Sequence, residues 1–154
     1  MRPGLIYPLL ALMLAACGDA SKPPAPTDGS AAQEATPSGP LSALGDRGLF
    51  RFRIQTEPAP PKLGDYFSIW TTVERVADGV RVSDGTLRLD ATMPEHRHGM
   101  TTLPKTRLHE DGRFHTVGCR FHMHGRWVIE LEFSQEGQRD RATIEFPFHP
   151  PAAR

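Results

Sequence analysis

Two short stretches of the sequence concentrate histidine and methionine, whose side chains can bind metal ions. The first, "MPEHRHGM", spans residues 93–100, and the second, "FHMHG", spans residues 121–125. Apart from two methionines at the extreme N-terminus, every methionine of the chain lies in these stretches, together with four of its seven histidines. This clustering predicts a metal site. Its candidate ligands are Met93, His96, His98, Met100, His122, Met123 and His124.

The types of these side chains favour copper. Imidazole binds copper, zinc, nickel and iron, whereas the soft thioether of methionine selects Cu(I) over harder divalent ions. Zinc sites usually draw on cysteine and histidine instead. We therefore expect copper as the cofactor, with Cu(I) favoured over Cu(II). The alternative is a solvated loop residue for His96 and His98, an exposed strand residue for His122 and His124, and a core residue for Met93 and Met123.

The spacing of the candidates makes a geometric prediction. If residues 94–100 are extended, His96, His98 and Met100 project from one face, because side chains alternate along a strand. The same alternation puts His122 and His124 on one face of the second stretch. It points Met123 into the core, together with Val117, Cys119 and Phe121. Met93 and Met123 are thus the candidates most suited to core packing, and Cys119 is expected to be a small buried side chain rather than a ligand.

The N-terminus predicts export and a lipid anchor. Residues 5–16 form a mostly apolar run, too short to span a bilayer as a helix but suited to a signal peptide. The sequence Leu14-Ala15-Ala16-Cys17 resembles the lipobox of bacterial lipoproteins, in which the chain is cleaved before the cysteine and the cysteine is acylated. We expect residues 1–16 to be this signal, with an ordinary secretory signal as the alternative. Acylated Cys17 would anchor the protein in the cell envelope, on the periplasmic face of the inner or outer membrane.

Residues 17–45 are predicted to be a disordered tether. They are rich in Pro, Ala, Ser and Gly and contain too few large apolar side chains to offset the chain entropy lost on folding. Lipidation of Cys17 would leave Cys119 without a partner for an internal disulfide. The whole chain carries 18 basic and 18 acidic residues without a basic stripe, so nucleic acid is not an expected partner.

Residues 46–150 are predicted to form one all-β domain. Apolar and polar residues alternate in runs such as "LFRFRIQ", "TLRLDA" and "RWVIELEF", which is typical of half-buried strands. Turn dipeptides separate the runs, for example Asp84-Gly85, Asp111-Gly112 and Glu136-Gly137. About seven short strands of this kind predict a small antiparallel β-sandwich of immunoglobulin-like type.

The two His/Met stretches also support a family resemblance. "MPEHRHGM", followed by a hairpin and then "FHMHGRWVIELEF", resembles the YtkA-like family, which is related to FixH-like domains. The resemblance covers roughly residues 48–148 and implies a small extracytoplasmic β-sandwich linked to copper handling and cytochrome oxidase assembly. It also implies that a copper-accepting protein, such as an oxidase assembly component, is a partner. This chain has His124 where the family usually has proline.

The sequence thus predicts a membrane-tethered, extracytoplasmic copper-binding protein: a chaperone, a buffer or an oxidase-assembly factor. An enzyme is not expected, because no nucleophile has a plausible base and the metal ligands lack a clear general base. The competing hypothesis is a structural or partner-binding β-sandwich lipoprotein that binds no metal.

Overall fold

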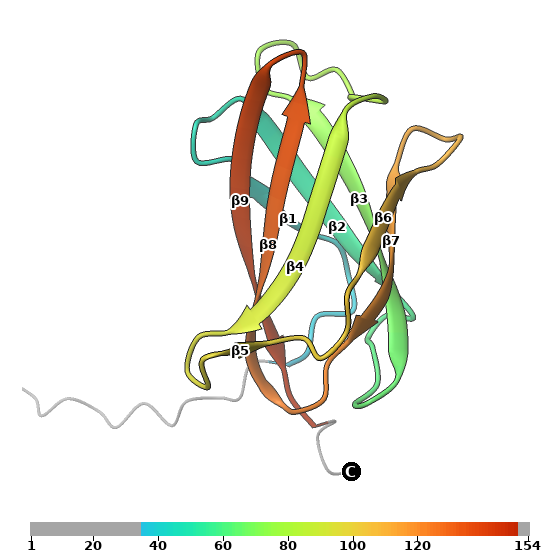
Figure 1. The fold of residues 1–154 in the computed structure, drawn as a ribbon, viewed down its shortest axis with the longest axis vertical. Helices are drawn as coiled ribbons and strands as arrows, with labels where there is room; N and C mark the ends of the chain where they lie inside the picture. The colour runs from blue at the N-terminus through green and yellow to red at the C-terminus, as the bar shows by residue number, and fades with distance from the viewer. Residues whose placement is uncertain (1–34, 151–154) are drawn as a thin grey trace, which may run out of the picture. The chain divides into compact units, whose positions relative to one another are not determined.

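The computed structural model describes residues 35–150, which form two antiparallel β-sheets packed face to face (Figure 1). Within this range no helix is long and apolar enough to cross a membrane. The strands are β1 (Leu41–Leu44), β2 (Phe50–Glu57), β3 (Tyr66–Arg75), β4 (Thr86–Met93), β5 (His98–Gly99), β6 (Lys105–Leu108), β7 (Phe114–Arg120), β8 (Gly125–Gln135) and β9 (Gln138–Phe148).

The strand order confirms an immunoglobulin-like sandwich. One sheet has the order β1-β2-β3-β7-β6, and the other has the order β5-β4-β8-β9. In immunoglobulin lettering, β2, β3 and β4 are strands A, B and C, β5 is C′, and β6 to β9 are D to G. The sheets then read A-B-E-D and C′-C-F-G, which is the immunoglobulin arrangement. β1 is an additional edge strand beside β2.

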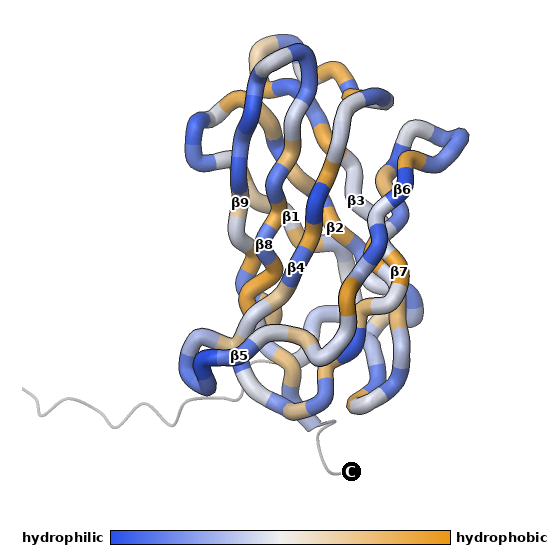
Figure 2. Tube along the Cα trace, viewed as in Figure 1, coloured by the Kyte–Doolittle hydropathy of each residue, from blue (hydrophilic) through white to orange (hydrophobic). Residues whose placement is uncertain are grey.

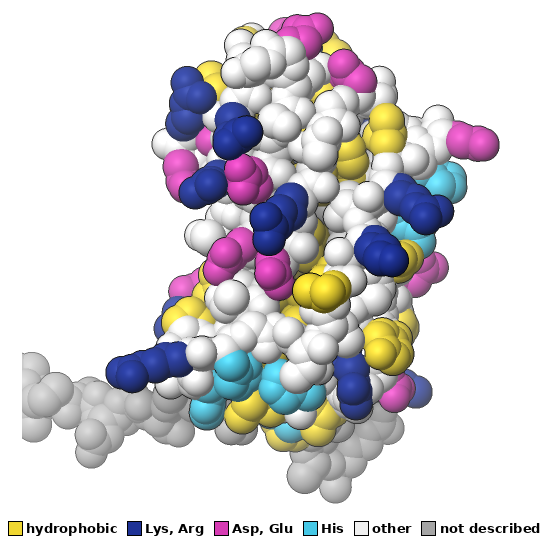
Figure 3. Space-filling model, viewed as in Figure 1, with side chains coloured by type: hydrophobic (Ala, Val, Ile, Leu, Met, Phe, Trp, Pro, Cys, Tyr) yellow, Lys and Arg dark blue, Asp and Glu magenta, His cyan; other side chains and the backbone are white. Residues whose placement is uncertain are grey.

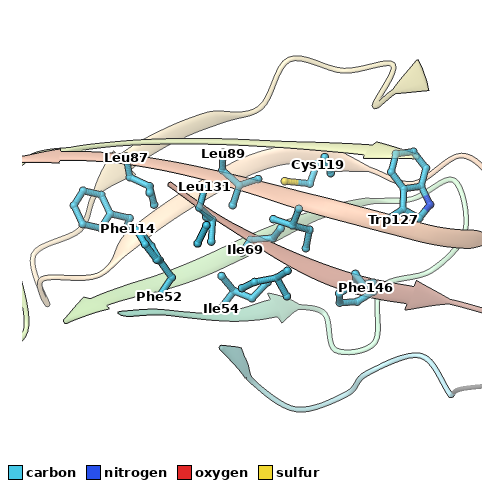
Figure 4. Packing of buried hydrophobic residues seen from close by; sticks show 14 of the residues in the cluster. Phe52, Ile54, Ile69, Leu87, Leu89, Phe114, Cys119, Trp127, Leu131 and Phe146 are labelled. Atoms are coloured by element: carbon cyan, nitrogen blue, oxygen red, sulfur yellow. The ribbon is translucent and has the colours of Figure 1, made fainter. Parts of the chain in front are cut away.

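The alternating sequence runs form the core as predicted. β2 alternates buried and exposed residues along its whole length, and β4, β8 and β9 bury every second residue over most of their length. Hydrophobic and hydrophilic residues accordingly alternate along the strands (Figure 2). The inward side chains of the two sheets interdigitate between the layers (Figure 4). Near one end of the core, the ring of Phe133 lies edge-on to three other rings, with centroid distances of 4.9 Å to Phe50, 6.5 Å to Phe52 and 5.7 Å to Phe114. Burial of these rings is a main source of stability.

The domain begins earlier than predicted. Residues 41–44 were assigned to the tether but form β1, which pairs with β2 in the register Leu41↔Ile54 to Leu44↔Arg51. The turn that follows is held by buried Asp140, whose carboxylate accepts hydrogen bonds from four backbone N–H groups. The long-range hydrogen bonds from residues 47, 49 and 50 to Asp140 order a segment whose composition alone does not favour a regular structure. The signal, Cys17 and the tether up to residue 34 lie outside the described residues.

A β-bulge in β7 overturns one prediction of inward orientation. Cys119 pairs with Phe67 but Thr116 pairs with Ile69, so β7 contains one more residue than β3 between these two pairs. Gly118 accommodates the extra residue with a φ of 83°. Thr116 and Cys119 therefore both face the core, while Val117 is 44% exposed rather than buried. Bulges commonly redirect a strand beside a functional site, and this one precedes the second His/Met stretch.

Candidate metal centre

The first His/Met stretch forms a tight hairpin between β4 and β5, so the extended conformation that would place His96, His98 and Met100 on one face does not occur. Residues 94–97 are a turn, in which the N–H of His96 donates to the carbonyl of Met93 at 3.0 Å and Arg97 adopts a φ of 56°. Beyond the turn, His98 pairs with Met93 across the hairpin. His96 is consequently exposed at the tip, whereas His98 is half-buried at the base.

The second stretch is the connection between β7 and β8, and its side chains do not alternate as in a strand. Residues 121–124 lie outside any strand. Both Met123 and His122 approach His98, although strict alternation would have pointed them in opposite directions. Met123 packs against the core, as predicted, but its sulfur also reaches His98, because the backbone leaves the strand conformation after Arg120.

His98 is the residue at which the two stretches meet. Its Nε2 lies 3.2 Å from the Sδ of Met123, and its ring centroid lies 4.9 Å from that of His122. Two donors that bind one first-row metal ion at about 2.0 to 2.3 Å cannot lie more than about 4.6 Å apart. The nitrogen of His98 and the sulfur of Met123 meet this condition. Histidine side chains gather visibly at this end of the sandwich, beside β5 (Figure 3).

The hydrogen bonding of His98 favours metal binding through Nε2. Nδ1 lies 3.2 Å from the carbonyl oxygen of Gly99, which can only accept a hydrogen bond. A proton on Nδ1 satisfies this contact and leaves a lone pair on Nε2, facing the thioether of Met123. Two electron pairs that face each other in this way are stabilised by a soft cation between them. A backbone carbonyl that fixes the tautomer of a ligating histidine is a recurrent feature of metal sites.

His122 is suited to remain neutral at this position. Burial of its ring lowers its pKa from the ordinary value, and the positive charges of His98, when protonated, and of Arg120 lower it further. Its Nδ1 is buried without a hydrogen-bond partner among the described residues. A histidine must be neutral to bind a metal ion, so a lowered pKa extends binding to lower pH.

The other predicted ligands lie at different depths in the structure. His96 is exposed at the rim, with its ring centroid 5.8 Å from that of His98. Met100 is half-buried and packs against the core. His124 packs its ring against Phe148 at a centroid distance of 4.9 Å, and its Nδ1 also has no partner in the described part of the chain. Met93 is fully buried in the core, in agreement with the alternative prediction that it packs there rather than binding metal.

Buried Met93 packs against the last residue of the second stretch, Gly125. A Cβ added to Gly125 would lie 2.5 Å from the terminal Cε of Met93, and Gly125 has a φ of 139°. The positive φ favours glycine at this position, where the chain passes from the 121–124 loop into β8, whereas the contact with the flexible end of Met93 could be relieved by a small shift of that side chain. Met93 thus packs against Gly125, at the end of the loop that carries His122 and Met123.

Cys119 is a core residue, as predicted. It is fully buried, and burial, aided by the negative charge of Asp90, raises the pKa of its thiol to about 12. The thiolate required for metal binding is therefore not populated at neutral pH. Within residues 35–150, no group of three or more His, Cys, Asp or Glu side chains could hold a metal ion.

Two further histidines lie elsewhere, on the β6–β7 hairpin. His115 stacks on the indole of Trp70 at 3.9 Å, and His109 meets the edge of the same indole at 5.2 Å. The guanidinium of Arg113 lies 4.2 Å from the centre of the Trp70 ring. These contacts make a packed surface cluster on the β6–β7 hairpin.

Comparison with known families decides the relationship of the chain. Residues 50–132, more than half of the sequence, match the YtkA-like family. The chain belongs to the YtkA-like family. The matched segment of this YtkA-like protein contains both His/Met stretches and seven of its nine described strands in whole or in part. No curated protein and no solved structure matches the chain.

Proposed function

We propose that this YtkA-like protein is an extracytoplasmic copper-binding protein, tethered to the membrane through acylated Cys17, that holds Cu(I) at the β5 end of its sandwich. His98, His122 and Met123 are the central ligands. His96, Met100 and His124, in the same two His/Met stretches, are candidates for additional ligands. Met93 packs beneath the loop that carries His122 and Met123. The protein acts as a chaperone, buffer or assembly factor and passes its metal to an acceptor protein.

The observation that carries this proposal is the 3.2 Å contact between His98 Nε2 and Met123 Sδ. These atoms come from separate stretches, 25 residues apart in the sequence. A soft sulfur paired with an imidazole nitrogen is a donor set that matches Cu(I) better than zinc or a hard divalent ion. Such donors remain available in an oxidising compartment, where a thiolate would be prone to oxidation.

The arrangement suits metal transfer rather than permanent storage. His98, His122 and Met123 are only half-buried, and His96 is exposed on the hairpin tip. A partner can therefore approach from solvent and replace the ligands one at a time. The ligands are neutral side chains, so a partner that offers a thiolate would bind Cu(I) more strongly and draw the ion away. No bond other than a metal–ligand bond is made or broken in this exchange.

Cu(I) titration of the full-length protein, purified in detergent with a chromophoric Cu(I) chelator as competitor, tests the proposal. We expect His98→Ala and Met123→Leu each to lower the Cu(I) affinity at least about tenfold, since even supporting residues of metal sites contribute that much. The leucine keeps the volume of the methionine, so a loss of binding reports on the sulfur rather than on packing.

His109→Ala is the matched control. It removes an exposed histidine on the β6–β7 hairpin and should leave Cu(I) affinity unchanged. Equal binding by the wild type and the His98→Ala variant would refute the site. Absence of Cu(I) binding by the wild type would favour the alternative function, a partner-binding β-sandwich lipoprotein without metal.

A further inference from the structure

Trp127 lies directly beneath the candidate ligands. It is fully buried as the third residue of β8, just beyond the loop that carries His122 and Met123. Its indole stacks on the ring of Phe121 with a centroid distance of 4.4 Å and an interplanar angle of 15°. Figure 4 shows its side chain at one end of the core. The indole is thus packed against Phe121, the first residue of the 121–124 loop.

The Trp127 indole contacts each of the three central ligands. Its ring is edge-on to His98 at 6.0 Å and to His122 at 5.6 Å. Its Nε1–H donates a hydrogen bond of 3.1 Å to the backbone carbonyl of Met123. Edge-on aromatic contacts fix the orientation of rings as well as burying their area. One rigid side chain therefore contacts all three residues that the proposed function assigns to the metal.

We propose that Trp127 is the positioning residue of the His/Met site, holding Met123 through its indole N–H and orienting the rings of His98 and His122. This inference rests on the proposed function for its metal chemistry, but the positioning itself is a property of the metal-free protein. The loop at 121–124 lies outside any strand, and the N–H of Gly64 holds its first residue by donating to the carbonyl of Phe121 at 2.8 Å. The hydrogen bond from Trp127 anchors the same loop at Met123, between the two histidines. A phenylalanine would keep the aromatic ring but could not make this bond.

The chain contains a matched control in Trp70, its other tryptophan. Trp70 also contacts histidine rings and also donates one hydrogen bond, to Glu57 at 2.7 Å, but from the outer face of the other sheet. The full-length protein in detergent is compared as Trp127→Phe and Trp70→Phe. We expect Cu(I) affinity to fall about threefold to tenfold in Trp127→Phe only, the range for loss of one hydrogen bond. Equal affinities in the two variants would overturn the proposal.

A double-mutant cycle separates positioning from a general effect of packing. If Trp127 acts through the sulfur of Met123, then Trp127→Phe should have little further effect on Cu(I) affinity once Met123→Leu has removed that sulfur. Full additivity of the two substitutions would show that Trp127 does not act through Met123. Thermal unfolding of the same variants identifies any loss of affinity that comes from a loss of folded protein.

Metal-free measurements keep the inference separate from the proposed function. Amide hydrogen exchange at residues 122–125 should be about threefold to tenfold faster in Trp127→Phe and unchanged in Trp70→Phe. In the wild type, the indole N–H resonance of Trp127 should be more protected from exchange than that of Trp70 and should shift on Cu(I) addition. Failure of the wild type to bind Cu(I) would refute the proposed function alone. Unchanged exchange in Trp127→Phe would refute the positioning role alone.

Discussion

Asp140 offers a sharp test of what holds the domain together far from the candidate site. The residue is 1% exposed and lies near the start of β9. Phe148, which contacts His124, lies at the other end of the same strand. Its Oδ1 accepts hydrogen bonds from the N–H groups of Arg47 and Arg141, both at 2.9 Å. Its Oδ2 accepts from the N–H groups of Leu49 at 2.9 Å and Phe50 at 3.2 Å.

Asp140→Asn changes this arrangement with almost no change in volume. Whichever way the amide is turned, its NH₂ group replaces an oxygen that accepts two hydrogen bonds, and it faces two N–H donors. Hydrogen bonds to a charged group contribute about 1.5 to 3 kcal/mol each. Loss of two of them predicts a decrease of about 3 to 6 kcal/mol in the free energy of unfolding. A domain of this size has about 5 to 15 kcal/mol in total, so the variant should be close to unfolding.

Urea unfolding followed by tryptophan fluorescence measures the loss. Asp46→Asn is the matched control, because it removes the same charge from an exposed residue nearby and should change stability by less than about 0.5 kcal/mol. At a temperature where Asp140→Asn is folded, its Cu(I) affinity should equal that of the wild type. A decrease in stability below about 1 kcal/mol would refute the reasoning that the hydrogen bonds from Arg47, Leu49 and Phe50 to Asp140 hold the β1–β2 turn.

Three further predictions concern the site and its surroundings. Cys119, with a thiol pKa of about 12, should not react with a thiol reagent at pH 8 in the folded protein and should react fully in urea; stoichiometric labelling without urea would contradict its burial. Because the pKa of His122 is lower in the folded than in the unfolded state, the unfolded state binds more protons as pH falls through about 6.5. Metal-free stability should therefore fall over that range, and less so in His122→Gln; identical pH profiles of unfolding would exclude the effect. Gly125→Ala, at a φ of 139° and against Met93, should reduce stability by about 1 to 3 kcal/mol and weaken Cu(I) binding, measured by urea unfolding and by chelator competition. An alanine variant as stable as the wild type would show that this backbone conformation is not required.

The pattern of alternating residues was sufficient to predict the sandwich but not all of its strands. β2, β4 and β8 each bury one face, so period-two hydrophobicity identifies them without knowledge of their partners. β1 and β5 have four and two residues and exist because a neighbouring strand pairs with them, which no local pattern reveals. The exposure of Val117 was likewise unpredictable, because the bulge depends on the register between β7 and β3.

The sequence by itself determined which side chains are available for metal chemistry and that they fall in two stretches. It also determined the all-β class, since strand periodicity is a local property of the chain. Only the tertiary structure decided which of these side chains meet. Sheet pairing brings His98 to Met123 and His122, leaves His96 at a hairpin tip, and places Met93 in the core. The physical reason is that metal binding requires donor atoms within a few ångströms, a distance set by the packing of β4, β5 and β8 and by the anchoring of their loops, not by spacing along the chain.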